Sequence, residues 1–262
     1  MSFPGSILLG QGDIYRQSST KQHPLGTRGY TRDGRVYRYA RNGAAALLPG
    51  MLIQKTAPHA DDVAEPLADS TDWAVPTTST TLIRLSTATS MATADFFKDG
   101  YFMVTAGATE SGTGQMLQIE SCPKTTATAG PAYCPEIFLR EEDKLVTALT
   151  TSVTISLIKN PYDQVVVGLD AAPTGLPVGV CPINVTIAYY FWLQTWGMAC
   201  MRVSDTWIIG HNIIYGSATG TRPGEALPMT SLEADKGSAI VGMADYIGTD
   251  GYYGSAMLTL AP

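Results

Sequence analysis

The sequence has almost no helical periodicity. No stretch of four turns carries apolar residues at i, i+3, i+4 and i+7, whereas runs of β-branched and aromatic residues recur between turn signals. Clear runs are Tyr101–Thr105, Gln115–Ile119, Glu136–Leu139 and Ser152–Ile158. Strands at such short spacing favour a barrel or sandwich over a parallel sheet with helical crossovers. The pattern therefore predicts an all-β protein with a β-barrel or β-sandwich-like body and very little helix.

Breaks in this pattern divide the chain into four predicted segments. Residues 1–55 predict an extended basic arm with one β-hairpin, because residues 1–25 lack a core pattern and Asp33-Gly34 supplies a tight turn. Residues 56–79 predict an acidic, Pro-rich connector. Residues 80–170 and 171–262 predict a central and a C-terminal β domain, with one continuous body as the alternative.

The most apolar strand is expected within Asn184–Gly197. Both of its faces are apolar, so we expect it to be buried on both sides, in the core or at a contact between subunits. Its aromatic residues Tyr190, Trp192 and Trp196 are therefore candidates for a core or an oligomer contact.

Charge is scarce and unevenly distributed. Only 15% of the 262 residues are charged, against about 25% in typical soluble domains. Residues 1–55 hold eight basic and two acidic residues, a net charge of +6, and the remaining residues carry −12. Such polarity favours contact between the arm and an acidic surface, in a neighbouring copy or a foreign partner, although an ordinary solvated face is an alternative.

The predicted partner-binding residues follow from this charge pattern. The arginines of the hairpin suit carboxylates, and two tyrosines that alternate with them suit apolar anchoring. The predicted contacts are Arg28, Arg32, Arg35, Tyr37, Arg38, Tyr39 and Arg41.

The sequence offers little catalytic machinery. It has no nucleophile elbow and no phosphate-binding glycine loop, and Glu141, Asp143 and His211 are the only candidates for hydrolysis. We expect no enzyme activity, cofactor or metal. The four cysteines form no CxxC pair, which predicts buried thiols in a reducing cytoplasm, with a Cys122–Cys134 bridge as the alternative.

Two kinds of partner are not expected. The whole chain has a pI of about 5.0, which disfavours nucleic acid despite the arginine-rich hairpin. The longest apolar stretch, Val185–Met201, contains polar residues and is shorter than a membrane span, and Met1–Gly5 lacks the basic start of a signal peptide.

Several blocks resemble one family of viral proteins. Residues Gln22–Tyr30 and Asp33–Ala45 resemble a pattern in structural proteins encoded near the major capsid protein of tailed bacteriophages. Later blocks resemble the same family in the same order: Asp99–Tyr101, Gly114–Ile119, Lys159–Tyr162, Val178–Pro182 and Tyr190–Gly197. The acidic connector and the four cysteines depart from this pattern.

The resemblance implies a virion protein of the head-decoration, or capsid cement, type. Such a protein is non-enzymatic, binds the outside of the capsid and stabilises it by bridging capsomers. The major capsid protein is then the expected partner, self-association as a homotrimer is expected, and the protein is placed on the virion surface after assembly in the host cytoplasm. A phage tail or receptor-binding component is one alternative, and a hydrolase of host surface polymers is another.

Overall fold

The computed structural model describes residues 5–58, 65–67, 76–85, 94–106, 112–123, 136–150, 152–168, 174–215, 222–229 and 238–262. Within these residues the chain forms eighteen strands and one four-residue helix, α1 (Gln11–Ile14). The prediction of an all-β fold with very little helix is confirmed. The chain divides into unit 1, which combines Met1–Ala57 with Pro161–Pro262, and unit 2, Pro58–Asn160.

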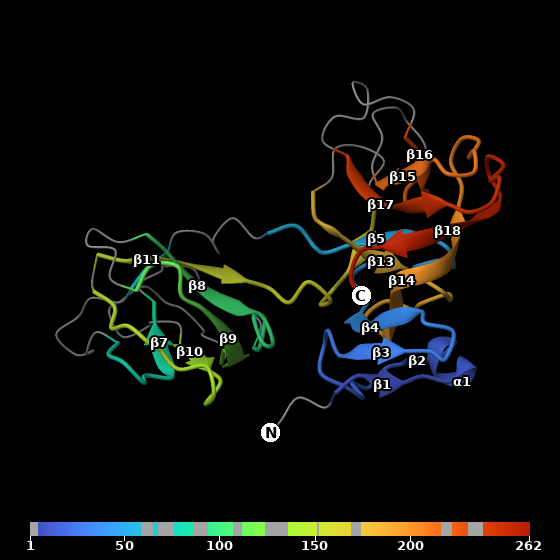
Figure 1. Ribbon diagram of the computed structural model, residues 1–262. Helices are drawn as coiled ribbons and strands as arrows, with labels where there is room; N and C mark the ends of the chain where they lie inside the picture. Colours follow the sequence, from blue (N-terminus) through green and yellow to red (C-terminus); the bar gives the residue numbers. More distant parts are fainter. Residues whose placement is uncertain are drawn as a thin grey trace. The chain divides into compact units, whose positions relative to one another are not determined.

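Unit 1 is built on a twelve-stranded sheet (Figure 1). Its longest path runs β1-β3-β4-β14-β18-β17-β15-β16, and β2, β5, β12 and β13 pair beside that path. The strands are β1 (Ile7–Leu8), β2 (Gln17–Ser18), β3 (Arg28–Tyr30), β4 (Val36–Arg41), β5 (Leu52–Gln54), β12 (Val166–Val167), β13 (Pro177–Val180), β14 (Tyr190–Arg202), β15 (Asn212–Tyr215), β16 (Leu227–Pro228), β17 (Ala239–Ala244) and β18 (Tyr253–Thr259).

Strand β14 is the central element of unit 1. Its first half pairs with β4 and its second half with β18, and the two halves meet at Gly197, which has a φ of +85°. Leu193 and Trp192 point to opposite faces and belong to different core clusters. The prediction that this strand is buried on both sides is thus confirmed for its first half, where residues 191–195 are all buried.

Unit 2 is a six-stranded antiparallel sheet in the order β6-β11-β8-β9-β10-β7. One core cluster of its own stabilises it, and Ile83, Phe102, Ile119, Ile137 and Ile155 are fully buried there. Its strands are β6 (Glu65–Pro66), β7 (Leu82–Arg84), β8 (Tyr101–Ala106), β9 (Met116–Ser121), β10 (Glu136–Leu139) and β11 (Thr154–Ile158).

The units do not follow the predicted segment boundaries. Residues 5–57 are no separate arm, because β3 and β4 pair into the sheet of unit 1 and β4 pairs with β14, about 150 residues away in sequence. No break occurs near residue 171 either, since β13 pairs with both β5 and β14. The prediction failed because these pairings are long-range, and a local reading of the pattern cannot detect them. Most of the predicted connector, residues 56–79, lies outside the described residues.

Candidate partner-binding surface

Arg41 does not face a partner. Its Nε and Nη2 donate to the two carboxylate oxygens of Asp163 at 2.6 and 2.9 Å. The Asp163 side chain is only 6% exposed, so this pair ties the end of β4 to the segment that enters unit 1 after residue 160. A two-pronged ion pair of this kind fixes geometry as well as adding energy. Arg41 is therefore a structural residue, and its prediction as a partner contact is wrong.

Arg38 and Arg35 are also occupied within the chain. The Arg38 guanidinium donates to the carbonyl oxygens of Gly26 and Pro262, each at 3.3 Å. Arg35 donates from Nε to Asp33 Oδ2 at 2.8 Å, and the Thr31 hydroxyl donates to the other carboxylate oxygen. The hydrogen bond from Thr31, aided by Arg35, lowers the pKa of Asp33, and this turn keeps its charges paired.

The two tyrosines of β4 lie in the core rather than on a docking surface. Tyr37 and Tyr39 are 0% and 3% exposed and pack with Leu9, Ile14 and Trp192. Burial raises the pKa of Tyr37 to about 12. The Tyr39 hydroxyl accepts a hydrogen bond from the backbone N–H of Gln22 at 3.1 Å. Their prediction as anchors for a partner is wrong, because the alternation of β4 sends both rings inward against β14.

Arg28 and Tyr30 point outward from β3. Gly29 between them is buried, and a Cβ at that position would come within 2.5 Å of Leu9 Cδ1 and 2.9 Å of Trp192 Cζ3. Glycine thus lets β3 lie directly on the core, and that packing holds its two neighbours toward solvent. The Arg28 guanidinium lies 6.0 Å from the centroid of the Tyr30 ring and donates to Ser6 Oγ at 2.8 Å.

Arg32 is the least constrained of the predicted contacts. It is exposed at the turn between β3 and β4, and no ion pair of its side chain occurs within the described residues. Asp33 next to it already pairs with Arg35. The turn therefore leaves the positive charge of Arg32 uncompensated beside Tyr30.

A groove of about 420 Å³ adjoins this turn. Its apolar wall comes from the N-terminal residues of unit 1 and its polar rim from the turn that follows β3. Helix α1 shapes one side, and its start is held by a hydrogen bond from the Gly10 N–H to Asp13 Oδ2 at 2.9 Å. The lining residues are Leu8, Leu9, Gly10, Gln11, Ile14, Thr31, Arg32, Asp33 and Arg35.

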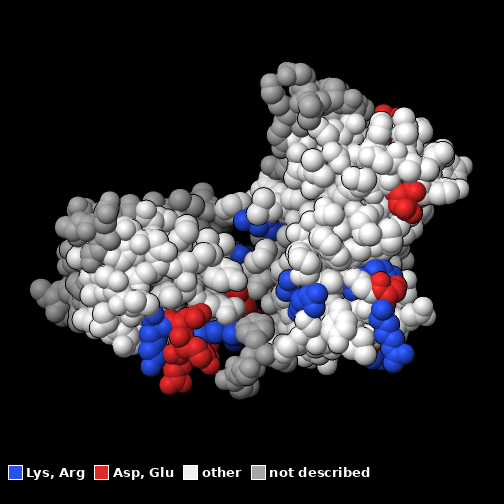
Figure 2. All heavy atoms as spheres, viewed as in Figure 1, with Lys and Arg blue, Asp and Glu red and all other residues white. Residues whose placement is uncertain are grey.

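We call Arg28, Tyr30, Arg32 and this groove the hairpin edge. Figure 2 shows Lys and Arg side chains gathered over the part of unit 1 that contains β1 to β4. The hairpin edge combines two guanidinium groups, an exposed ring and an apolar recess, which suits a segment that carries a carboxylate and an apolar side chain. Sequence reasoning found the two arginines but missed the groove. The one available signal was the apolar run Ile7-Leu8-Leu9 before the Asp13 cap.

The aromatic residues predicted as a core or oligomer contact fall on the core side. Trp192 is 4% exposed, and its ring lies 5.1 Å from Tyr39 and 5.4 Å from His23, measured between centroids. Tyr190 is half-buried and stacks on Tyr39 at 5.9 Å with an interplanar angle of 9°. Trp196 is half-buried at the point where β14 changes partners.

The three candidates for hydrolysis are not brought into one cluster within either unit. Glu141 and Asp143 belong to unit 2, whereas His211 belongs to unit 1. Glu141 is exposed, and Asp143 accepts a hydrogen bond from the backbone N–H of Gln118 at 3.2 Å.

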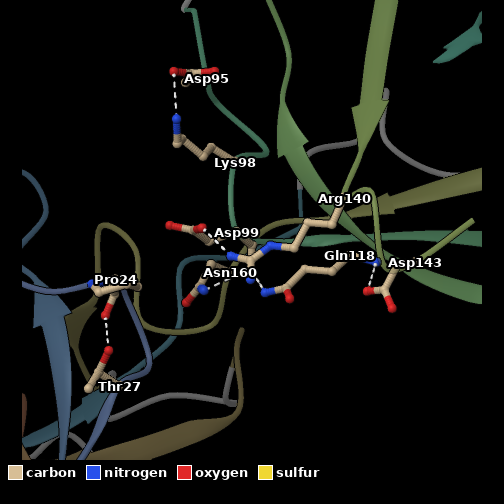
Figure 3. A network of polar contacts seen from close by, with 9 residues as sticks. All are labelled: Pro24, Thr27, Asp95, Lys98, Asp99, Gln118, Arg140, Asp143 and Asn160. Atoms are coloured by element: carbon tan, nitrogen blue, oxygen red, sulfur yellow. Dashed lines mark hydrogen bonds and ion pairs between the residues drawn. The ribbon is translucent and has the colours of Figure 1, made fainter. Parts of the chain in front are cut away.

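The polar network beside Asp143 fixes a turn (Figure 3). Asp99 has a φ of +61° and is held there by Arg140, whose Nη2 donates to Asp99 Oδ1 at 3.0 Å. Asn160 donates from Nδ2 to the Asp99 carbonyl oxygen at 2.9 Å. These bonds satisfy the buried groups that start β8, which is a structural role.

The described cysteines are free thiols. Cys122 is buried, and its Sγ accepts a hydrogen bond from the Phe97 N–H at 3.2 Å. Burial raises the pKa of Cys181 to about 12. Cys200 is exposed on β14, so the prediction of buried thiols is wrong for this residue, while Cys134 lies outside the described residues.

Within the described parts of the chain, no group of three or more His, Cys, Asp and Glu side chains is placed to hold a metal ion. No helix among the described residues is long and apolar enough to cross a membrane. Comparison with known proteins gives no relative, since no family model, no curated protein and no solved structure matches the chain.

Proposed function

We propose that this protein is a non-enzymatic structural component of a tailed-bacteriophage virion, which binds the outside of the capsid and stabilises it by bridging capsomers. The ordered sequence blocks that resemble phage structural proteins support the phage assignment. The observation that carries the binding role is the hairpin edge: five of the seven predicted contacts are used inside the chain, while Arg28 and Arg32 stay outward beside an apolar groove.

The hairpin edge suits attachment to an acidic surface. An arginine presents a planar fork that matches a carboxylate, and neither Arg28 nor Arg32 is engaged with a carboxylate among the described residues. An apolar side chain of the partner can enter the groove beside Leu8, which is 50% exposed. The proposed partner is the major capsid protein, with location on the capsid surface after assembly in the host cytoplasm.

The remaining surface is consistent with extensive contact. A protein that strengthens a shell needs many weak contacts spread over area, rather than one reactive site. The chain has a low charged fraction, and both units are rigid sheets with cores of their own. Rigid sheets lose little conformational entropy when they are immobilised on a shell.

The test is binding to purified heads that lack this protein. Charge reversal by Arg32→Glu should weaken co-sedimentation with heads by at least ~10-fold, because a like charge at the contact replaces a favourable one. The affinity of the unsubstituted protein should also fall as ionic strength rises.

Lys144→Glu is the matched control. Lys144 is an exposed cation of unit 2, outside the hairpin edge, and the same reversal there should leave head binding unchanged. Equal binding by Arg32→Glu and the unsubstituted protein would refute the role of the hairpin edge. Immunogold labelling separates the alternative location, because a tail or receptor-binding component would label tails and not heads.

A further inference from the structure

Three methionines form a row across the outer face of the sheet in unit 1. Met198 on β14 is paired with Met257 on β18, and Met257 is paired with Met243 on β17. Their side chains are 38%, 43% and 49% exposed in that order. Three large apolar side chains therefore stand side by side in solvent on neighbouring strands.

The register of the sheet places these methionines outward. Ala199, Met201, Ala256 and Leu258 alternate with them along β14 and β18 and are buried in one core cluster. Gly242 brings β17 close to β18, because a Cβ there would lie 2.2 Å from the Met257 carbonyl oxygen. The row is consequently a fixed feature of a regular sheet.

The surroundings of the row are largely uncharged. On the same face Trp196 is paired with Thr259 and Cys200 with Ser255, and Tyr253 is 52% exposed. Figure 2 shows few charged side chains over β17 and β18. A contiguous exposed apolar patch on a sheet marks a site of interaction, and methionine suits such a surface because its side chain adapts to what it meets.

Two charges lie at the margins of this face, and they have opposite signs. Arg202 lies at the end of β14, on one side of β18. Asp245 follows β17 on the other side of β18, and its carboxylate accepts a hydrogen bond from Ser255 Oγ at 3.4 Å.

We propose that this face binds the same face of a second copy of the chain, with Met198, Met243 and Met257 at the centre of the contact. Charge selects this partner. Copies that each carry a net charge of −6 repel one another where acidic surfaces meet, and a nearly neutral face allows approach without that cost. A two-fold axis along β18 sets β14 of one copy over β17 of the other, so Arg202 approaches the end that carries Asp245.

The geometry resembles the packing of two sheets in a sandwich. Aligned sheets pack about 10 Å apart with interdigitated side chains, and methionines of both copies would fill that layer. A face that binds itself closes as a pair, which differs from the trimer expected from the sequence. In the strand order β4 and β14 lie between β3 and β18, so the contact leaves Arg28 and Arg32 on a different part of the sheet.

The test is the molar mass of the full chain by sedimentation equilibrium across a range of concentrations. The unsubstituted protein should show a reversible monomer–dimer equilibrium. Met257→Lys places two like charges near the axis and should weaken association by at least ~100-fold. Met116→Lys is the matched control, because Met116 is 50% exposed on a strand of unit 2, and it should leave the dimer unchanged.

A second measurement does not depend on a variant. Brief oxidation with peroxide, read by mass spectrometry, should modify Met257 more slowly at high protein concentration and Met116 at the same rate throughout. A monomer or a trimer at every concentration would overturn the proposal, as would equal effects of the two substitutions. Head binding is a separate assay, so a dimer that fails to bind heads would refute the proposed function and leave this inference standing.

Discussion

Removal of Arg41 should destabilise unit 1 more than removal of its partner. Arg41→Ala leaves the carboxylate of Asp163, whose side chain is 6% exposed, buried without the guanidinium that satisfies both of its oxygens. Loss of one member of a buried ion pair costs about 3–5 kcal/mol. Asp163→Ala leaves Arg41, which is 31% exposed and can be hydrated, so we expect a smaller cost of about 1.5–3 kcal/mol.

The assay is urea unfolding followed by tryptophan fluorescence, because Trp192, Trp196 and Trp207 all belong to unit 1. A cost of 3 kcal/mol corresponds to a roughly 150-fold change in the unfolding equilibrium. Arg41→Lys retains the charge but loses the two-pronged geometry, and should fall between the two deletions. A loss below ~0.5 kcal/mol for Arg41→Ala, or a larger loss for Asp163→Ala, would refute the structural role assigned to this pair.

Three further predictions concern packing, pH and thiol reactivity. Gly29→Ala should lower the stability of unit 1 by about 1–3 kcal/mol by urea unfolding, because the added Cβ overlaps Leu9; an unchanged midpoint would contradict this. Burial raises the pKa of Glu225, against Arg222 and Arg202, so its contribution to stability is present below the unfolded pKa and is lost as pH rises through the folded value. Glu225→Gln should therefore gain stability relative to the unsubstituted protein between pH 4 and pH 7, and a relative loss would show that the arginines dominate. In the native protein at pH 8, mass spectrometry should find Cys200 modified by a thiol reagent and Cys181 protected, and the reverse order would contradict their burial.

Local sequence pattern was sufficient to predict the strands. Alternation and β-branched content placed strands at Tyr101–Thr105, Gln115–Ile119 and Glu136–Leu139, and the structure has strands at each. The continuous apolar run around Trp192 correctly indicated a strand that is buried on both sides.

Long-range pairing was the part that the sequence could not supply. The first 55 residues have no apolar core pattern of their own, because β3 and β4 complete a sheet whose other strands lie about 150 residues later. Without that pairing, Tyr37 and Arg38 are indistinguishable from an exposed hairpin, and the structure shows one in the core and the other tied to Pro262. Arg41 could not be recognised as structural either, since Asp163 is 122 residues away.

The candidate site was predicted only in part. Charge counting identified the basic hairpin and so included Arg28 and Arg32, which stay outward. It could not separate them from the arginines that are used internally, because all five share the same local pattern. The groove depends on α1 and Leu9 meeting the turn after β3, and no spacing in the sequence encodes that meeting.

The most direct test of the central claim is a cryo-EM map of intact particles of the virus that encodes this chain. The account predicts density for the all-β units on the outer surface of the head shell, with Arg28 and Arg32 of the hairpin edge turned toward the major capsid protein. Density confined to the tail, absence of the protein from purified particles, or a hairpin edge that faces solvent would contradict it.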